Sequence, residues 1–185
     1  DNPSDSDIFD ILMNKEQIVL TGVPGVGKSR YTKTLTESGK FVDSLTIQFH
    51  ANYSYEDFIG AEVLRSEDGD TYVTTKQGVF LKYIEKVKSD PYKSNKYLLV
   101  IDELNRGNIA EIFGESILAL DRNNEASLSK EYEDVGTLSI PDNLYIVATM
   151  NTSDRNIAFL DLAIRRRFAF VPLLPNNDFL SEEVV

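Results

Sequence analysis

The stretch Gly22-Val23-Pro24-Gly25-Val26-Gly27-Lys28-Ser29 follows an apolar, β-branched run at residues 17–21 and precedes a segment of helical character at residues 29–37. It matches the pattern G-x-x-x-x-G-K-[ST], and its place between a strand and a helix predicts a phosphate-binding loop. The glycines let backbone N–H groups converge on phosphate oxygens, and the N-terminus of the following helix favours negative charge. We expect the whole stretch and Arg30 to bind a nucleoside triphosphate, with Lys28 at its outer phosphates and Ser29 on Mg²⁺. The alternative is a glycine-rich turn without function, which the two flanking elements disfavour.

An acidic pair, Asp102-Glu103, follows the run Tyr97-Leu98-Leu99-Val100-Ile101. That run has no polar alternation, which is typical of a strand buried on both faces of a parallel sheet. Acidic side chains at the carboxyl end of such a strand open into the crevice where α/β sheets bind ligands. We expect Asp102 to hold Mg²⁺ and Glu103 to polarise the attacking water. By itself, such a pair is more often a helix cap or a solvated turn.

A second apolar run, residues 144–149, is followed by Met150-Asn151-Thr152-Ser153-Asp154-Arg155. We expect this strand beside the strand at 97–101, which places Asn151 to hydrogen-bond the water or the terminal phosphate from the side opposite Glu103. Asp154 of the same block is a further catalytic candidate. An Asx turn is the alternative interpretation of these polar residues.

Three arginines, Arg165-Arg166-Arg167, end a helix expected around residues 158–166, before a last strand at 168–171. Cations at a helix C-terminus are ordinary partners of the helix dipole. The sharper hypothesis is that one of them reaches the nucleotide of a neighbouring subunit as an arginine finger. Arg166 is our first candidate and Arg167 the second.

The remaining pattern predicts a strand at 45–49, a short helix at 53–59, a hairpin or irregular excursion at 61–78, and helices at 79–88 and 108–120. Residues 121–136 are expected to form a loop or surface insertion. Strands that alternate with helices predict a three-layer α/β domain with a parallel central sheet. We assign residues 1–175 to this core and residues 176–185 to the start of a truncated C-terminal segment. His50 has no second histidine or cysteine to share a metal, so we expect a structural role for it.

Composition limits the partners and the compartment. The formal net charge is −11, so the long-range field repels polyanions, and we expect DNA to be contacted mainly through other domains. The chain has no cysteine, which excludes disulfides and thiolate metal sites. No apolar run is long enough to span a bilayer and the first residues do not resemble a signal peptide, so we expect a cytoplasmic protein with no membrane contact. Because the chain does not begin with methionine, we interpret it as part of a longer protein.

Taken together, these motifs resemble the McrB family of AAA+ motors from modification-dependent restriction systems, over roughly residues 17–173. The block Met150 to Arg155 carries the most specific likeness. The resemblance implies a P-loop NTPase core of the AAA+ type, a hexameric ring with nucleotide at subunit interfaces, a partner nuclease of the McrC kind, and GTP in preference to ATP. Val23 replaces a proline common in this loop, and the helical lid that normally follows the core is absent from the sequence.

Two other functions fit the same motifs. One is a MoxR-like or chelatase-like remodelling ATPase. The other is a nucleotide-switched assembly scaffold in which binding, without hydrolysis, forms the ring. A pure switch needs no water-activating carboxylate, so Glu103, Asn151 and Arg166 argue against the scaffold.

Overall fold

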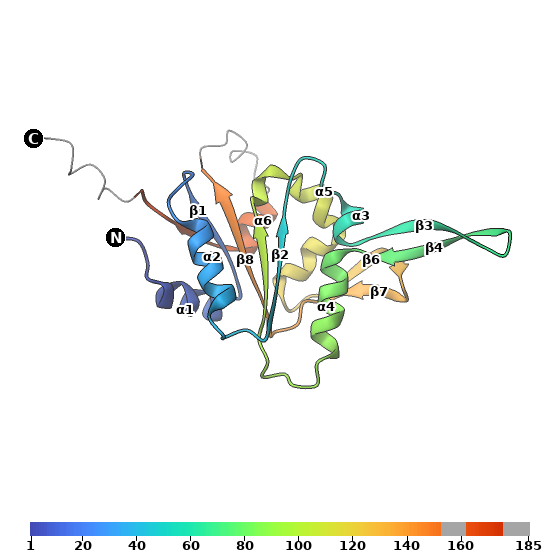
Figure 1. Ribbon diagram of the computed structural model, residues 1–185, viewed down its shortest axis with the longest axis horizontal. Coiled ribbons are helices and arrows are strands. Elements are labelled where there is room, and N and C mark those ends of the chain that lie inside the picture. The colour runs from blue at the N-terminus through green and yellow to red at the C-terminus, as the bar shows by residue number, and fades with distance from the viewer. Residues whose placement is uncertain (153–161, 176–185) are drawn as a thin grey trace, which may run out of the picture.

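The computed structural model describes residues 1–152 and 162–175, and its centre is a five-stranded sheet in the order β2-β5-β8-β1-β9 (Figure 1). All four strand pairings in this sheet are parallel. Its strands are β1 (Gln17–Gly22), β2 (Asp43–Gln48), β5 (Tyr97–Asp102), β8 (Leu144–Asn151) and β9 (Ala169–Pro172). The expected α/β architecture with a parallel central sheet is confirmed, as is the expectation that the two most apolar strands, β5 and β8, are neighbours.

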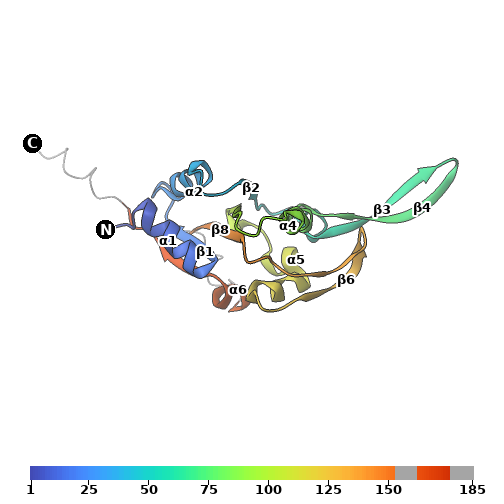
Figure 2. The ribbon, with the colours of Figure 1, turned by 90° about the horizontal axis from the view of Figure 1, so that it is seen from below.

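Helices cover both faces of the sheet, which gives three layers (Figure 2). Alternate residues of each strand point to opposite faces. Leu98 and Val100 of β5 pack in one core with α1 and α2, and Leu99 and Ile101 pack in a second, larger core with the other helices. The helical elements are α1 (Asp5–Lys15), α2 (Lys28–Glu37), α3 (Tyr55–Phe58), α4 (Val79–Ser89), η1 (Leu104–Arg106), α5 (Ile109–Phe113), η2 (Gly114–Asp121) and α6 (Leu162–Arg167), where η marks a 3-10 helix.

Two antiparallel hairpins stand apart from the central sheet. The first, β3 (Gly60–Glu67) with β4 (Asp70–Gln77), projects from the domain at the end opposite the N-terminus (Figures 1 and 2). It confirms the predicted hairpin. The second, β6 (Ala126–Tyr132) with β7 (Val135–Leu138), lies in the stretch 121–136 where we predicted a loop or surface insertion, and the structure shows it to be a surface hairpin. Its residues are polar because most of them face solvent, while Ala126 and Tyr132 anchor the hairpin in the core.

Two helix predictions also need correction. The single helix predicted at 108–120 is broken into α5 and η2 at Gly114, whose φ of 51° and ψ of −136° lie outside the helical region. Helix α1 was not predicted at all, because its acidic start resembled a polar tail. In the structure Ser4 and Asp7 form a capping box at its N-terminus, and Ile8 and Leu12 are fully buried. Four residues thus turn an acidic segment into a helix that covers the sheet.

Candidate nucleotide-binding site

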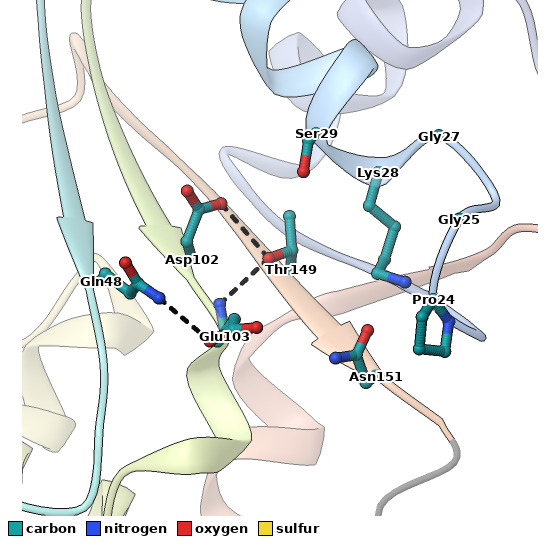
Figure 3. A pocket seen from close by; sticks show the side chains of 10 residues that line it. All are labelled: Pro24, Gly25, Gly27, Lys28, Ser29, Gln48, Asp102, Glu103, Thr149 and Asn151. Atoms are coloured by element: carbon teal, nitrogen blue, oxygen red, sulfur yellow. Dashed lines mark hydrogen bonds between the residues drawn. The ribbon is translucent and has the colours of Figure 1, made fainter.

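A cavity of about 440 Å³ opens at the carboxyl end of the central sheet, between the loop that follows β1 and the ends of β5 and β8 (Figure 3). This volume is within the range of small-ligand sites. Ten residues from segments far apart in the sequence line it: Pro24, Gly25, Gly27, Lys28, Ser29, Gln48, Asp102, Glu103, Thr149 and Asn151. The structure therefore brings the glycine-rich loop, the acidic pair and Asn151 to one place.

The glycine-rich loop has a backbone that other residues would strain. Gly25 and Gly27 have φ angles of 88° and 98°, in the left-handed region that L-residues rarely adopt. Helix α2 begins directly after Gly27, so its first N–H groups face the cavity from a helix N-terminus. The loop thus presents backbone donors to an anion, as the sequence predicts for a phosphate-binding loop.

Lys28 is buried within this loop. Its Nζ donates hydrogen bonds to the carbonyl oxygens of Gly22 (2.8 Å) and Val23 (2.9 Å). Desolvation lowers the pKa of Lys28, while the charge of Glu103 acts in the opposite direction. The two carbonyl oxygens are neutral and compensate the ammonium charge only in part. A phosphate in the cavity would supply a charged partner.

Asp102 and Ser29 provide the oxygen donors that a Mg²⁺ ion prefers. Both side chains face the cavity, Ser29 from the start of α2 and Asp102 from the end of β5 (Figure 3). Burial raises the pKa of Asp102 above its ordinary value, and the nearby charge of Glu103 acts in the same direction. The Thr149 hydroxyl donates a hydrogen bond of 3.3 Å to Asp102 Oδ1 and lowers this pKa in part. A divalent cation would compensate both carboxylates, so the donor set fits this ion.

Glu103 adopts a left-handed backbone conformation with φ of 55° and ψ of 49°. Such a conformation is uncommon for a residue other than glycine and is often found at functional sites. Two side chains restrain the residue: its N–H donates to Thr149 Oγ1 at 3.1 Å, and its Oε2 accepts from Gln48 Nε2 at 3.1 Å. Arg106 Nε lies 3.4 Å from the same oxygen. Thr149 therefore holds the backbone of Glu103, while Gln48 and Arg106 position the carboxylate that we expect to polarise water.

Asn151 ends β8, the strand that lies between β1 and β5. Its position in register with Gly22 places it beside the glycine-rich loop. Figure 3 shows its side chain at the cavity, between Glu103 and the loop. This is the location from which an amide can contact a terminal phosphate or a water molecule.

Other predicted site residues lie outside the cavity lining. Gly22, Val23 and Val26 belong to the loop without lining the cavity, and a Cβ on Gly22 would lie 2.6 Å from Val26 Cγ2. Arg30 is exposed and forms an ion pair of 2.9 Å with Asp5 of α1. Asp154 lies outside the described residues.

The two finger candidates and the histidine are also placed by the structure. Arg166 is exposed at the end of α6, whereas Arg167 pairs with Asp121 at 2.9 Å. His50 is exposed and accepts a hydrogen bond from the Asn52 N–H at 3.2 Å.

Three residues of this site were not singled out from the sequence. Gln48 and Thr149 were predicted only as residues of the strands at 45–49 and 144–149, and Arg106 was given no role. Gln48 and Thr149 are polar residues at the carboxyl ends of strands, and the parallel register places Gln48 directly beside Asp102. A polar residue near the carboxyl end of a strand was the available signal, but its role can be recognised only when the strand order is known.

Comparison with known proteins identifies the family. Residues 17–168 match the model of the AAA domain, dynein-related subfamily. The chain belongs to this AAA family. The matched range includes the glycine-rich loop, the acidic pair and Asn151, so these are parts of a P-loop NTPase domain.

Two curated relatives are restriction enzyme components. The chain is 35% identical over 173 residues to the type IV methyl-directed restriction enzyme EcoKMcrB subunit of Escherichia coli K12, covering 89% of this chain and 36% of that protein. It is 27% identical over 193 residues to the type II restriction enzyme BsuMI component YdiS of Bacillus subtilis, covering 82% of this chain and 55% of that protein. The predicted resemblance to McrB-like AAA+ motors is confirmed. The chain spans about a third to a half of these relatives.

A solved structure supports the fold. A crystal structure from Cytophaga hutchinsonii, described as a "putative ATPase", superposes with a TM-score of 0.53 at 23% identity and covers 93% of this chain and 46% of that one.

Within residues 1–152 and 162–175, no helix has the length and apolar character needed to cross a bilayer.

Proposed function

We propose that this domain hydrolyses a nucleoside triphosphate, GTP in preference to ATP, as the motor of a DNA restriction complex. The observation that carries the proposal is the convergence of Lys28, Asp102, Glu103 and Asn151 on one cavity beside a helix N-terminus. Backbone N–H groups of the loop bind the phosphates, and Lys28 exchanges its two carbonyl partners for phosphate oxygens.

The water-activating role falls to Glu103. Its carboxylate lies at the cavity and is fixed by the Gln48 amide, so it needs little reorganisation to accept a proton from water. Asn151 orients the terminal phosphate or that water from the side of β8. Mg²⁺, when bound by Ser29 and Asp102, neutralises phosphate charge.

Among the ten described residues that line the cavity, Lys28 is the one cation, so the side of the outer phosphate away from the loop needs a further cation from elsewhere. We propose that a second copy supplies it through Arg166, in a ring that is hexameric. The resemblance to McrB supports this arrangement, together with a nuclease partner of the McrC kind, DNA contacts made mainly through other domains, and a cytoplasmic location. The net charge of −11 is consistent with a motor domain that does not itself hold DNA.

Turnover of GTP and ATP by the intact protein, with and without Mg²⁺, tests the proposal. We expect Glu103→Gln to bind nucleotide with unchanged affinity and to lose at least 100-fold in kcat. Glu111→Gln is the matched control, because it makes the same substitution at an exposed carboxylate of α5 that does not line the cavity, and it should keep full turnover. Undiminished turnover in Glu103→Gln would refute the role of Glu103, and nucleotide-dependent assembly without phosphate release would favour a scaffold instead.

The base preference needs its own measurement. Competition of GTP against ATP for the Glu103→Gln protein gives relative affinities without the complication of turnover. Equal affinities, or a preference for ATP, would refute the GTP part of the proposal and leave hydrolysis in place.

A further inference from the structure

The backbone pairing between β5 and β8 ends before the residues of the site. The last pair in register is Ile101 with Ala148, and β8 continues to Asn151 in register with β1 alone. Beyond Ile101 the chain of β5 leaves the ladder at Glu103, whose backbone is left-handed, and enters η1. Backbone groups of β8 that face this side therefore need partners other than a strand.

Two side chains take the place of the missing backbone pairs. The first is Thr149, whose hydroxyl joins Asp102 and the Glu103 N–H. The second is Asn105 of η1, whose Nδ2 donates to the Asn151 carbonyl oxygen at 3.3 Å. Asn105 is 7% exposed and does not line the cavity, so an effect of Asn105 on a bound nucleotide has to pass through another residue.

The peptide group that joins Asn151 to Thr152 is held from both sides. Its carbonyl oxygen accepts from Asn105, and its N–H, which belongs to Thr152, donates to the Gly22 carbonyl at 3.1 Å. Because a peptide group is planar, these two bonds fix its orientation. Together with the pairing of β8 to β1, this fixes the direction in which the Asn151 side chain leaves the backbone.

We propose that Asn105 is a positioning residue that holds the Asn151 carbonyl and thereby keeps the Asn151 side chain at a fixed distance from Glu103. This inference rests on the proposed function, in which Glu103 activates water and Asn151 orients that water or the terminal phosphate. Both groups have to be in place at the same moment, and a displacement of about 1 Å can cost roughly 100-fold in rate. Asn105 lies two residues after Glu103 and binds the backbone of Asn151, so it couples the positions of the two groups.

The test measures kcat and KM for GTP and for ATP, with Mg²⁺, in the intact protein. Asn105→Leu keeps nearly the same shape and loses the donor, whereas Asn105→Ala removes most of the side chain. Each variant should lower kcat by about 10-fold and change KM by less than about 2-fold, because the glycine-rich loop still binds the nucleotide. Unchanged kcat in both variants would overturn the inference. A loss confined to Asn105→Ala would also overturn it, because a void and not the missing donor would then be the cause.

A double-mutant cycle identifies the residue through which Asn105 acts. In an Asn151→Ala background, Asn105→Leu should lower kcat by less than about 2-fold further, because the side chain that Asn105 positions is gone. A merely structural role would lower kcat by the same factor in both backgrounds, and that result would overturn the inference.

Asn143 provides a matched control at the other end of the same two strands. Its Nδ2 donates to the Asn95 carbonyl at 2.7 Å, so it joins the chain just before β8 to the chain just before β5. Asn143→Leu removes the same kind of bond at the end of the strands away from the cavity and should leave kcat within about 2-fold of the unmodified protein. A loss as large as in Asn105→Leu would show that any weakening of this strand pair slows turnover, which would overturn the specific role of Asn105.

Hydrogen exchange separates this inference from the proposed function. The Thr152 N–H belongs to the peptide group that Asn105 holds, so Asn105→Leu should accelerate its exchange by at least about 10-fold, and Asn143→Leu should not. This result does not depend on hydrolysis. Unchanged Thr152 exchange in Asn105→Leu would refute the positioning role, whereas absence of turnover in the unmodified protein would refute the proposed function alone.

Discussion

Replacing Thr149 by valine removes one hydroxyl that joins the two acidic residues of the site. Thr149 is 5% exposed, and its Oγ1 accepts from the Glu103 N–H at 3.1 Å and donates to Asp102 at 3.3 Å. Valine has the same shape, so the change leaves no cavity. The Glu103 N–H, at a residue with a left-handed backbone, loses its partner.

The cost follows from that unpaired donor. A buried N–H without a partner costs about 1 to 3 kcal/mol. In a domain of this size about 1 kcal/mol corresponds to roughly 2 to 4 °C in Tm, so Thr149→Val should lower Tm by about 2 to 12 °C. Because the same bond fixes the backbone of Glu103, kcat should also fall, by about 10-fold if roughly 1.4 kcal/mol of positioning is lost.

Thermal unfolding without nucleotide and steady-state turnover with Mg²⁺ measure the two effects. Thr149→Ser keeps the hydroxyl and should retain most of the activity. Thr21→Val makes the same change on the neighbouring strand β1, at a hydroxyl that has no hydrogen bond to another described residue, and should leave Tm nearly unchanged. A Thr149→Val protein with the Tm and turnover of the unmodified protein would refute the reasoning.

Three further predictions concern the loop, the metal site and a backbone position. Lys28→Ala should weaken nucleotide binding at least 10-fold in equilibrium titration, and unchanged affinity would exclude Lys28 as a phosphate ligand. Its Tm should not fall, because the buried ammonium has a lowered pKa and contributes little to stability when the site holds no phosphate. Asp102→Asn should raise Tm at pH 7, because burial disfavours the carboxylate that it replaces, and should abolish the Mg²⁺ dependence of binding. Burial raises the folded-state pKa of Asp102, so between its ordinary value and the raised value the folded protein binds more protons than the unfolded one. Its contribution to stability therefore grows as pH falls through that window and is lost above it, and a Tm–pH slope in this window that persists in Asp102→Asn would contradict this assignment. Gly114→Ala should destabilise the fold by about 2 kcal/mol or more, because φ is 51° and a Cβ would lie 2.9 Å from the Tyr55 ring. A loss of less than about 0.5 kcal/mol in the free energy of unfolding, measured by chemical denaturation, would contradict this prediction.

Local sequence was enough to identify the phosphate-binding loop, because its chemistry depends on residues adjacent in the chain. Gly25 and Gly27 supply the backbone freedom, and Lys28 and Ser29 follow at fixed spacing. The unbroken apolar run before Asp102 similarly indicates a central parallel strand, since only a strand covered on both faces can lack polar alternation. These features fixed the fold class and most of the predicted site.

Tertiary structure decided what depends on distant neighbours. The polar residues of β6 and β7 show no regular alternation of apolar and polar side chains, so the sequence did not predict these strands. Only the structure shows that they pair as an antiparallel hairpin. Gln48 became a partner of Glu103 through the register of β2 with β5, 55 residues apart in the sequence. Three consecutive arginines are chemically the same, and only the tertiary structure shows that Arg167 pairs with Asp121 of η2 whereas Arg166 is exposed. A sequence specifies which groups are available, whereas burial and long-range pairing determine which of them remain available to a ligand.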